Sequence, residues 1–162
     1  MDLNQSLKKI RMLVLDFDGT LTDGKVFVDQ NGIESVCCSR KDSLGLDMVQ
    51  GEGIRVTVIS KEKNQVVKAR CEKMGVEIWN GVDTGEGKLE ILIRLTSSYG
   101  LTREEVLYIG DDINDLPCMK FAGIAATVAD GHSECKKIAH VITENKGGNH
   151  AVREICDLLL SQ

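Results

Sequence analysis

Short apolar runs alternate with longer amphipathic runs along almost the whole chain. The apolar, β-branched runs predict buried strands at 11–17, 54–59, 76–79, 106–109, 124–128 and 140–142. Apolar residues spaced three and four apart predict helices at 43–50, 63–74, 86–98, 114–121, 133–139 and 151–160. This alternation predicts one α/β domain over residues 1–162, with a mostly parallel sheet and helices on both faces. Binding crevices in such sheets lie beyond the carboxyl ends of the strands.

Local signals refine this picture. The segments 25–28 and 33–37 flank Asp29-Gln30-Asn31-Gly32, which is typical of a β-hairpin turn. Asp42 is expected to be the N-cap of the helix 43–50, and Gly75 to end the helix 63–74. Thr102 and Glu105 have the spacing of a capping box.

Composition excludes several classes of protein. The 162 residues are 42% hydrophobic and 28% charged, which is the balance of a soluble globular domain. The net charge of −5 argues against a general nucleic-acid or membrane-surface binder. No apolar run approaches the roughly 18 residues of a membrane span, and no secretion signal is expected at the N-terminus. The six cysteines lack zinc-site spacing, so we expect reduced thiols in a cytoplasmic protein.

Two carboxylates follow the first predicted strand. Asp16 and Asp18 are two residues apart, so in extended chain both side chains point into one small space. Two like charges there are costly unless a cation joins them, and Gly19 allows the chain to turn sharply afterwards. The alternative is an acidic loop in which Asp18 caps a turn.

Other strand ends carry further polar groups. Ser60 and Lys61 end the second strand, and a hydroxyl beside an ammonium suits a phosphate oxygen, although a surface pair is the simpler interpretation. Lys88 falls in the first turn of a predicted helix, where the helix dipole disfavours a lysine unless it has another role. A solvated lysine is the alternative there.

A second acidic group follows the strand 106–109. Asp111, Asp112, Asn114 and Asp115 crowd its end, and hard oxygen ligands of this kind suit magnesium. A helix N-cap with acids in its first turn would explain Asp112 or Asp115, but not the whole group.

These four signals, in this order, resemble the motifs of the haloacid dehalogenase superfamily of phosphatases, over residues 11–160. Asp16-Phe17-Asp18-Gly19-Thr20 is similar to its nucleophile motif, and Gly110-Asp111-Asp112 to its metal motif. The resemblance implies a three-layer, Rossmann-like sheet. Residues 20–59 leave room for a β-hairpin flap and one helix, but not for a cap domain.

The resemblance also implies a mechanism, that of a Mg²⁺-dependent phosphomonoesterase. Asp16 would attack phosphorus, and Asp18 would act as acid and then as base. Ser60 and Lys88 would hold the phosphoryl oxygens. The metal ligands would be Asp16, Asp111 and the backbone carbonyl of Asp18, with Asp112 and Asp115 orienting those ligands and Lys88.

Within the superfamily, the segments 29–34 and 147–154 resemble the capless phosphatases of sugar-acid biosynthesis. These act on 3-deoxy-D-manno-octulosonate (KDO) 8-phosphate or on nine-carbon relatives. The resemblance implies contacts to substrate from Asp42, Lys61, Glu62, Lys73 and Arg153. Lys61 stands where the family usually has glycine, and Asn149-His150 departs from its glycine-rich tail.

At the positions of Glu62 and Lys73 the chain resembles the nine-carbon phosphatases, which have a glutamate and a lysine there. The eight-carbon enzymes usually have arginine at the first position and a residue other than lysine at the second. We therefore expect 2-keto-3-deoxynononate (KDN) or N-acetylneuraminate 9-phosphate as substrate, with KDO 8-phosphate as the second choice. Glu62 could accept hydrogen bonds from sugar hydroxyls, and Lys73 could pair with Glu62 or with the substrate carboxylate. An exposed charged helix face is the alternative.

The sequence can be compared with three rival functions. A phosphoacceptor receiver would carry its acceptor after a later strand, and a non-catalytic domain associated with a CMP-sialate cytidylyltransferase would lack the nucleophile, so Asp16 and Asp18 argue against both. A phosphatase of another small phosphate ester stays open. Because a capless site is open to water, we expect a homo-oligomer in which the hairpin 25–37 covers a neighbour's site, and the resemblance implies a tetramer. A solvated hairpin on a monomer is the alternative. No nucleic-acid or membrane partner is expected.

Overall fold

A six-stranded parallel sheet forms the centre of the computed structural model, which describes residues 2–162. The strand order is β5-β4-β1-β6-β7-β8. The strands are β1 (Met12–Leu15), β4 (Arg55–Ile59), β5 (Glu77–Trp79), β6 (Val106–Gly110), β7 (Ile124–Thr127) and β8 (Val141–Ile142). From β1 the chain builds outward through β4 and β5, then crosses back to β6 and continues the other way. The polar segment after β1 therefore lies at the point where the strand order reverses, where crevices form.

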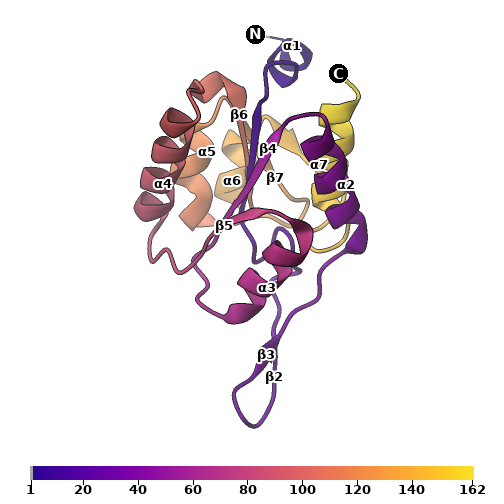
Figure 1. Cartoon of the computed structure of the whole chain (residues 1–162), viewed down its shortest axis with the longest axis vertical. Helices are drawn as coiled ribbons and strands as arrows, with labels where there is room; N and C mark the ends of the chain where they lie inside the picture. The colour runs from indigo at the N-terminus through magenta and orange to yellow at the C-terminus, as the bar shows by residue number, and fades with distance from the viewer. Residues whose placement is uncertain (1) are drawn as a thin grey trace.

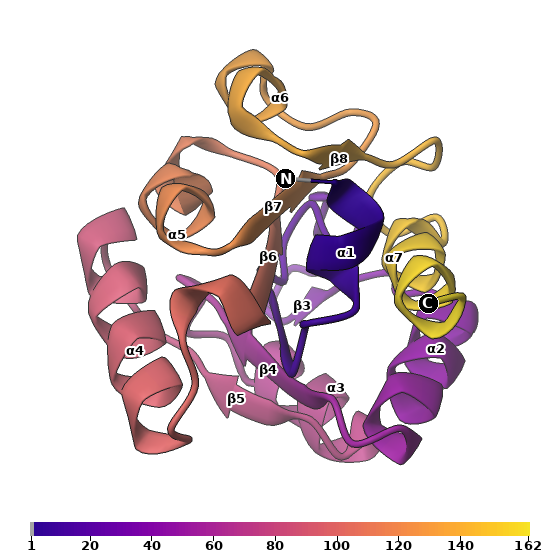
Figure 2. The same ribbon diagram turned by 90° about the horizontal axis from the view of Figure 1, so that it is seen from above.

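Helices cover both faces of the sheet, as Figures 1 and 2 show. One face carries α2 (Arg40–Gly51), α3 (Gln65–Met74) and α7 (Ala151–Leu160). The other carries α4 (Gly85–Ser98), α5 (Leu116–Phe121) and α6 (Ser133–Ile138). The short α1 (Leu3–Leu7) precedes β1. The predicted α/β class with a parallel sheet is confirmed.

The strand side chains alternate between two apolar cores. Leu13 and Leu15 pack in the core under α2, α3 and α7, whereas Met12 and Val14 pack in the core under α4, α5 and α6. All four residues of β1 are buried. A strand covered on both faces reads as a continuous apolar run, which is why 11–17 was recognisable in the sequence.

A two-stranded antiparallel hairpin, β2 (Phe27–Val28) and β3 (Glu34–Ser35), follows β1. Its turn is held by Asp29, whose Oδ1 accepts hydrogen bonds from the backbone N–H groups of Asn31 and Ile33. The hairpin projects from the body of the molecule, at the bottom of Figure 1. The hairpin and α2 are the regular elements between β1 and β4, so the predicted flap and the lack of a cap domain are confirmed.

Several boundaries differ from the prediction. Helix α2 begins at Arg40, and its N-cap is Ser39, whose side chain accepts from the Lys41 N–H; Asp42 as N-cap was wrong. Asp42 lies in the first turn, where its charge suits the helix dipole. The predicted helix 114–121 divides into the short 3₁₀ helix η2 (Ile113–Asp115) and α5. Helix α1 was not predicted, because five residues with one buried side chain carry little periodicity.

Two predicted helix signals are confirmed: Gly75 ends α3 in a left-handed conformation, and Thr102 and Glu105 form a capping box at η1 (Arg103–Glu105). The six cysteines are free thiols, and Cys71, Cys118, Cys135 and Cys156 are buried in the core. Within residues 2–162, no helix combines the length and the apolar character that a bilayer crossing requires.

Candidate active site

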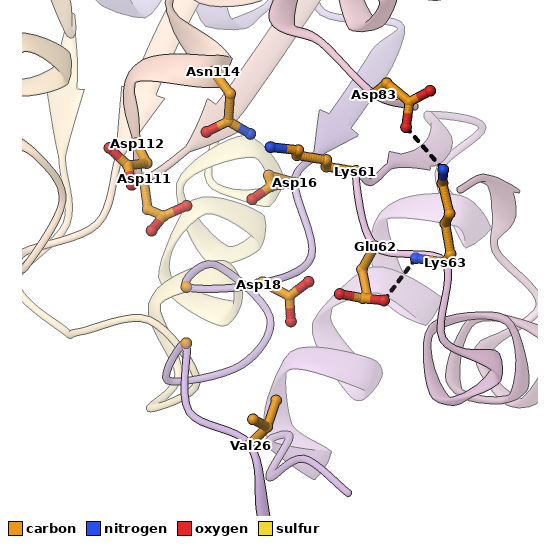
Figure 3. A pocket seen from close by; sticks show the side chains of 12 residues that line it. Asp16, Asp18, Val26, Lys61, Glu62, Lys63, Asp83, Asp111, Asp112 and Asn114 are labelled. Carbon is orange, nitrogen blue, oxygen red and sulfur yellow. Dashed lines mark hydrogen bonds and ion pairs between the residues drawn. The ribbon is translucent and has the colours of Figure 1, made fainter. Parts of the chain in front are cut away.

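An open pocket of about 690 Å³ lies at the carboxyl ends of β1, β4, β5 and β6. Its position follows from the topology, since parallel strands bring the segments after them to one edge of the sheet. The residues that line it are Asp16, Asp18, Gly19, Gly24, Val26, Lys61, Glu62, Lys63, Asp83, Asp111, Asp112 and Asn114. Figure 3 shows their side chains.

Lys88 joins two of the carboxylates beneath the pocket. Thr84 caps α4, and the first turn then directs Lys88 into the protein, where its side chain is fully buried. The Lys88 Nζ donates to Asp16 Oδ1 at 2.6 Å and to Asp115 Oδ1 at 2.8 Å. Burial alone would lower the pKa of Lys88, but the two carboxylates outweigh it and raise that pKa, so the ammonium stays charged. The lysine therefore has a role that offsets its unfavourable place on the helix.

Asp115 uses both of its carboxylate oxygens within the protein. Its Oδ1 also accepts from the Tyr108 hydroxyl at 2.8 Å. Its Oδ2 accepts from the backbone N–H groups of Asp111 and Asp112, at 3.0 and 3.3 Å. Asp115 thereby holds the loop after β6 and Lys88 in place, and it has little capacity left to bind a ligand.

Three acids are close enough to surround a cation. Asp16, Asp111 and Asp115 each have a carboxylate oxygen within 4.8 Å of the others. Burial, followed by repulsion from Asp115, raises the pKa of Asp16 well above its ordinary value and that of Asp111 to about 7. Because Lys88 alone does not neutralise this charge, the donor set fits a hard divalent cation. Asp16 and Asp111 have the oxygens free to bind it.

Gly19 allows Asp111 to approach the turn after β1. Its φ of +81° lies in the left-handed region. A Cβ at this position would lie 2.0 Å from Asp111 Oδ2. The left-handed backbone and the close approach of Asp111 both require glycine at position 19.

Asp18 lies beside Glu62 at the pocket wall (Figure 3). Partial burial, followed by repulsion from Glu62, raises the pKa of the Asp18 carboxyl, which suits a proton donor. The Glu62 Oε1 accepts from the backbone N–H groups of Lys63 and Asn64, both at 2.7 Å. Those bonds fix the Glu62 carboxylate next to Asp18.

Ser60 lies beneath the pocket lining rather than in it. It is only 1% exposed, and its Oγ accepts from the Glu62 N–H at 3.1 Å. This hydrogen bond fixes the start of the loop that follows β4. Ser60 and Lys88 thus form the floor under the acidic pocket.

Three residues expected to contact substrate lie outside this pocket. Asp42 is buried, and its Oδ1 accepts from the Arg153 N–H at 2.8 Å, so both help to join α2 and α7. Lys73 is exposed in the last turn of α3, which runs antiparallel to the strands and ends near their amino edge. Within residues 2–162 no ion pair joins Lys73 to Glu62, which was one of the two partners suggested for Lys73.

Sequence reasoning assigned no role to several residues of the site. Asp83 and Lys63 line the pocket, and Tyr108 supports Asp115. Asp83 could have been found, because it follows β5 as the other acids follow β1 and β6. Tyr108 could not, since a buried tyrosine in a strand shows no partner in sequence.

Comparison with known proteins gives concordant matches. A family model described as haloacid dehalogenase-like hydrolase matches residues 48–155. The chain is 34% identical to the 3-deoxy-D-manno-octulosonate 8-phosphate phosphatase KdsC of Escherichia coli K12 over 160 residues, covering 98% of this chain and 84% of that protein.

Solved structures agree with this similarity. The chain matches a 3-deoxy-D-manno-octulosonate 8-phosphate phosphatase of Moraxella catarrhalis, in complex with magnesium, phosphate and KDO, with a TM-score of 0.92 and 33% identity. That match covers 98% of this chain and 90% of the other. It also matches the cobalt-bound deoxy-D-mannose-octulosonate 8-phosphate phosphatase of Haemophilus influenzae, with a TM-score of 0.90, 31% identity and coverage of 97% and 91%.

Proposed function

Because the chain belongs to the haloacid dehalogenase-like hydrolases, within the family of the KDO 8-phosphate phosphatases, we propose that it is a Mg²⁺-dependent phosphatase of a 2-keto-3-deoxy sugar acid. The observation that carries the proposal is the group formed by Asp16, Asp111 and Lys88 at the open edge of the sheet. This group combines a nucleophile, oxygen donors for a cation and a fixed positive charge. Those are the requirements of phosphoryl transfer through an enzyme carboxylate.

The proposed reaction has two steps. An oxygen of Asp16 attacks phosphorus, and the bond from phosphorus to the sugar oxygen breaks as Asp18 gives that oxygen its proton. Water then attacks the aspartyl phosphate, Asp18 takes back a proton, and inorganic phosphate leaves while the Asp16 carboxylate is restored. The raised pKa of Asp18 supports its role as proton donor. Lys88 orients Asp16 and, with Ser60, stabilises charge on the phosphoryl oxygens.

Asp16 and Asp111, with the backbone carbonyl of Asp18, would hold the magnesium ion. When bound, the ion offsets the repulsion between the carboxylates and the phosphate dianion. Asp115 holds its neighbours rather than the metal, because both its oxygens already accept hydrogen bonds. Asp112 is exposed and caps η2, so its role is to order that turn.

The chemistry is tested by removing the nucleophile and the metal. Asp16→Asn should lower kcat by on the order of 10³-fold or more, and Asp18→Asn nearly as much, while both variants keep the wild-type circular dichroism spectrum. EDTA should abolish turnover and magnesium should restore it. Full activity of Asp16→Asn, with deamidation excluded by mass spectrometry, would contradict the proposal.

Within the sugar acids, we infer a preference for a nine-carbon 9-phosphate, such as that of KDN or N-acetylneuraminate, over KDO 8-phosphate. Glu62 supports this inference, because its carboxylate lines the pocket and its Oε2 accepts no hydrogen bond from residues 2–162. It is thus free to accept from a sugar hydroxyl. Lys73 adds no support from within the same chain.

Steady-state kinetics on the three phosphates test this preference. We expect a higher kcat/KM for the nine-carbon substrates, and Glu62→Ala should remove most of the difference. A higher kcat/KM for KDO 8-phosphate that Glu62→Ala leaves unchanged would assign the eight-carbon substrate. The assignment as a phosphatase would then still stand.

We also infer a homo-oligomer, a tetramer in particular, located in the cytoplasm. An open pocket beside a projecting, apolar hairpin supports assembly, because a second copy would cover both and exclude water. Six free thiols support a reducing compartment.

A further inference from the structure

The three lysines around the pocket differ in whether their ammonium groups already form ion pairs with carboxylates of the protein. Six carboxylates and two lysines line the pocket, and Lys88 lies beneath it. Lys88 contacts Asp16 and Asp115, as described above. Lys63 pairs with Asp83 at 3.0 Å. Lys61 has no such partner in the part of the chain that the structure describes, so its positive charge is available to a ligand.

The Lys61 side chain extends toward the part of the pocket that contains Asp16. It leaves the end of β4 next to Ser60, and in Figure 3 its ammonium lies near Asp16 and Asn114. Glu62, from the next position, points instead toward Asp18. The two neighbours thus divide the pocket, with the cation beside the nucleophile and the carboxylate beside the proton donor.

We propose that Lys61 binds a non-bridging oxygen of the substrate's phosphoryl group. This inference rests on the proposed phosphatase function. A phosphate dianion that enters a pocket lined by six carboxylates is repelled, and the buried Lys88 is already shared between two acids. A lysine ammonium on a flexible stem supplies a compact charge that can follow the phosphoryl group during transfer.

Binding of inorganic phosphate tests the proposal without turnover. Isothermal titration calorimetry in the presence of magnesium would give the phosphate Kd for wild type, Lys61→Gln and Lys63→Gln. We expect Lys61→Gln to weaken binding about tenfold, the range for one partly exposed charge-assisted hydrogen bond. Lys63→Gln, which removes the same charge from the same pocket, should change Kd by less than about twofold because Lys63 is paired with Asp83. Lys61→Arg should retain most of the affinity.

A second ligand distinguishes the phosphate from the substrate's own carboxylate. The free sugar acid carries the carboxylate but no phosphate, so its inhibition constant should be the same in wild type and Lys61→Gln. Equal phosphate Kd values for Lys61→Gln and Lys63→Gln, or a loss of sugar-acid inhibition alone, would overturn the proposal. These outcomes are separate from failure of the proposed function, which would appear as a wild-type protein that binds phosphate but hydrolyses no sugar-acid phosphate.

Discussion

Asp111 shows at the residue scale how the site opposes the stability of the metal-free protein. Its folded pKa of about 7 exceeds the unfolded value of 3.8, with burial as the largest cause and Asp115 as the second. The folded state therefore binds protons more tightly than the unfolded state. The contribution of Asp111 to the free energy of unfolding therefore becomes more favourable as the pH falls through 7 toward 4. At pH 8 the carboxylate is charged in both states, and its burial destabilises the folded protein.

Asp111→Asn removes that destabilising charge. In EDTA at pH 8 we expect its Tm to rise by about 2–5 °C above wild type, because an amide needs no counter-charge. The same variant should lose most of the Tm increase that magnesium gives to wild type, since a ligand that binds only the folded state stabilises it. Differential scanning fluorimetry measures both effects.

Asp112→Asn is the matched control for Asp111→Asn. Asp112 is exposed and caps η2 through the Ile113 N–H, and asparagine caps equally well. Its Tm should stay close to wild type with and without magnesium. A similar response of both variants would show that neither carboxylate has a special relation to the metal.

At the scale of elements, the loop between β8 and α7 supports the turn that follows β1. Gly147 packs so closely against this turn that a Cβ would lie 1.7 Å from the Gly19 carbonyl oxygen. The neighbouring Gly148 N–H donates to the Thr20 carbonyl oxygen at 3.1 Å. Gly147 and Gly148 belong to the segment 147–154 that resembles the sugar-acid phosphatases. Both are required because their backbone packs directly against the backbone of the distant turn after β1.

Gly147→Ala should push this loop away from the turn that carries Asp16 and Asp18. We expect kcat to fall at least about tenfold and the protein to lose about 1–3 kcal/mol of stability, as in other overpacked sites. Gly51→Ala is the control, because Gly51 ends α2 with open space around it, and alanine there should be neutral or slightly stabilising. Urea denaturation and steady-state kinetics of both variants test this prediction, and unchanged activity of Gly147→Ala would contradict it.

At the scale of the whole molecule, the hairpin leaves apolar side chains in contact with water. Val26, Phe27, Val28 and Ile33 are 49%, 71%, 58% and 66% exposed. They lie together on an element that projects from the body (Figure 1). Such an apolar group on an exposed element is typical of an interface, so assembly through the hairpin is the expected state.

Phe27→Glu should weaken that assembly by placing a charge in the interface. Light scattering at assay concentration should show an oligomer for wild type and a smaller species for the variant, with kcat/KM reduced because the pocket is less covered. Ile93→Glu, at a 43% exposed position of α4, should leave the mass unchanged. A wild-type monomer would rule out the assembly.

Much of the fold and part of the site followed from the sequence by itself. Strand–helix alternation is a local, periodic signal, and in a parallel sheet it forces the residues after each strand to one edge. Asp16, Asp18, Lys61 and Asp111 could therefore be placed together without knowledge of any contact. The local misfit of Lys88 at a helix start indicated a further role for this lysine, but its burial is known only from the structure.

Only the tertiary structure shows which of these side chains have oxygens that are free to bind a ligand. Asp115 and Asp111 look alike in sequence, but Tyr108, Lys88 and two backbone N–H groups occupy the oxygens of Asp115 and leave Asp111 available. Likewise Lys73 is only eleven positions after Glu62, yet α3 carries it toward the opposite edge of the sheet. Spacing along a chain specifies where an element begins, whereas hydrogen-bond partners depend on which elements pack together, and that is a property of the folded molecule.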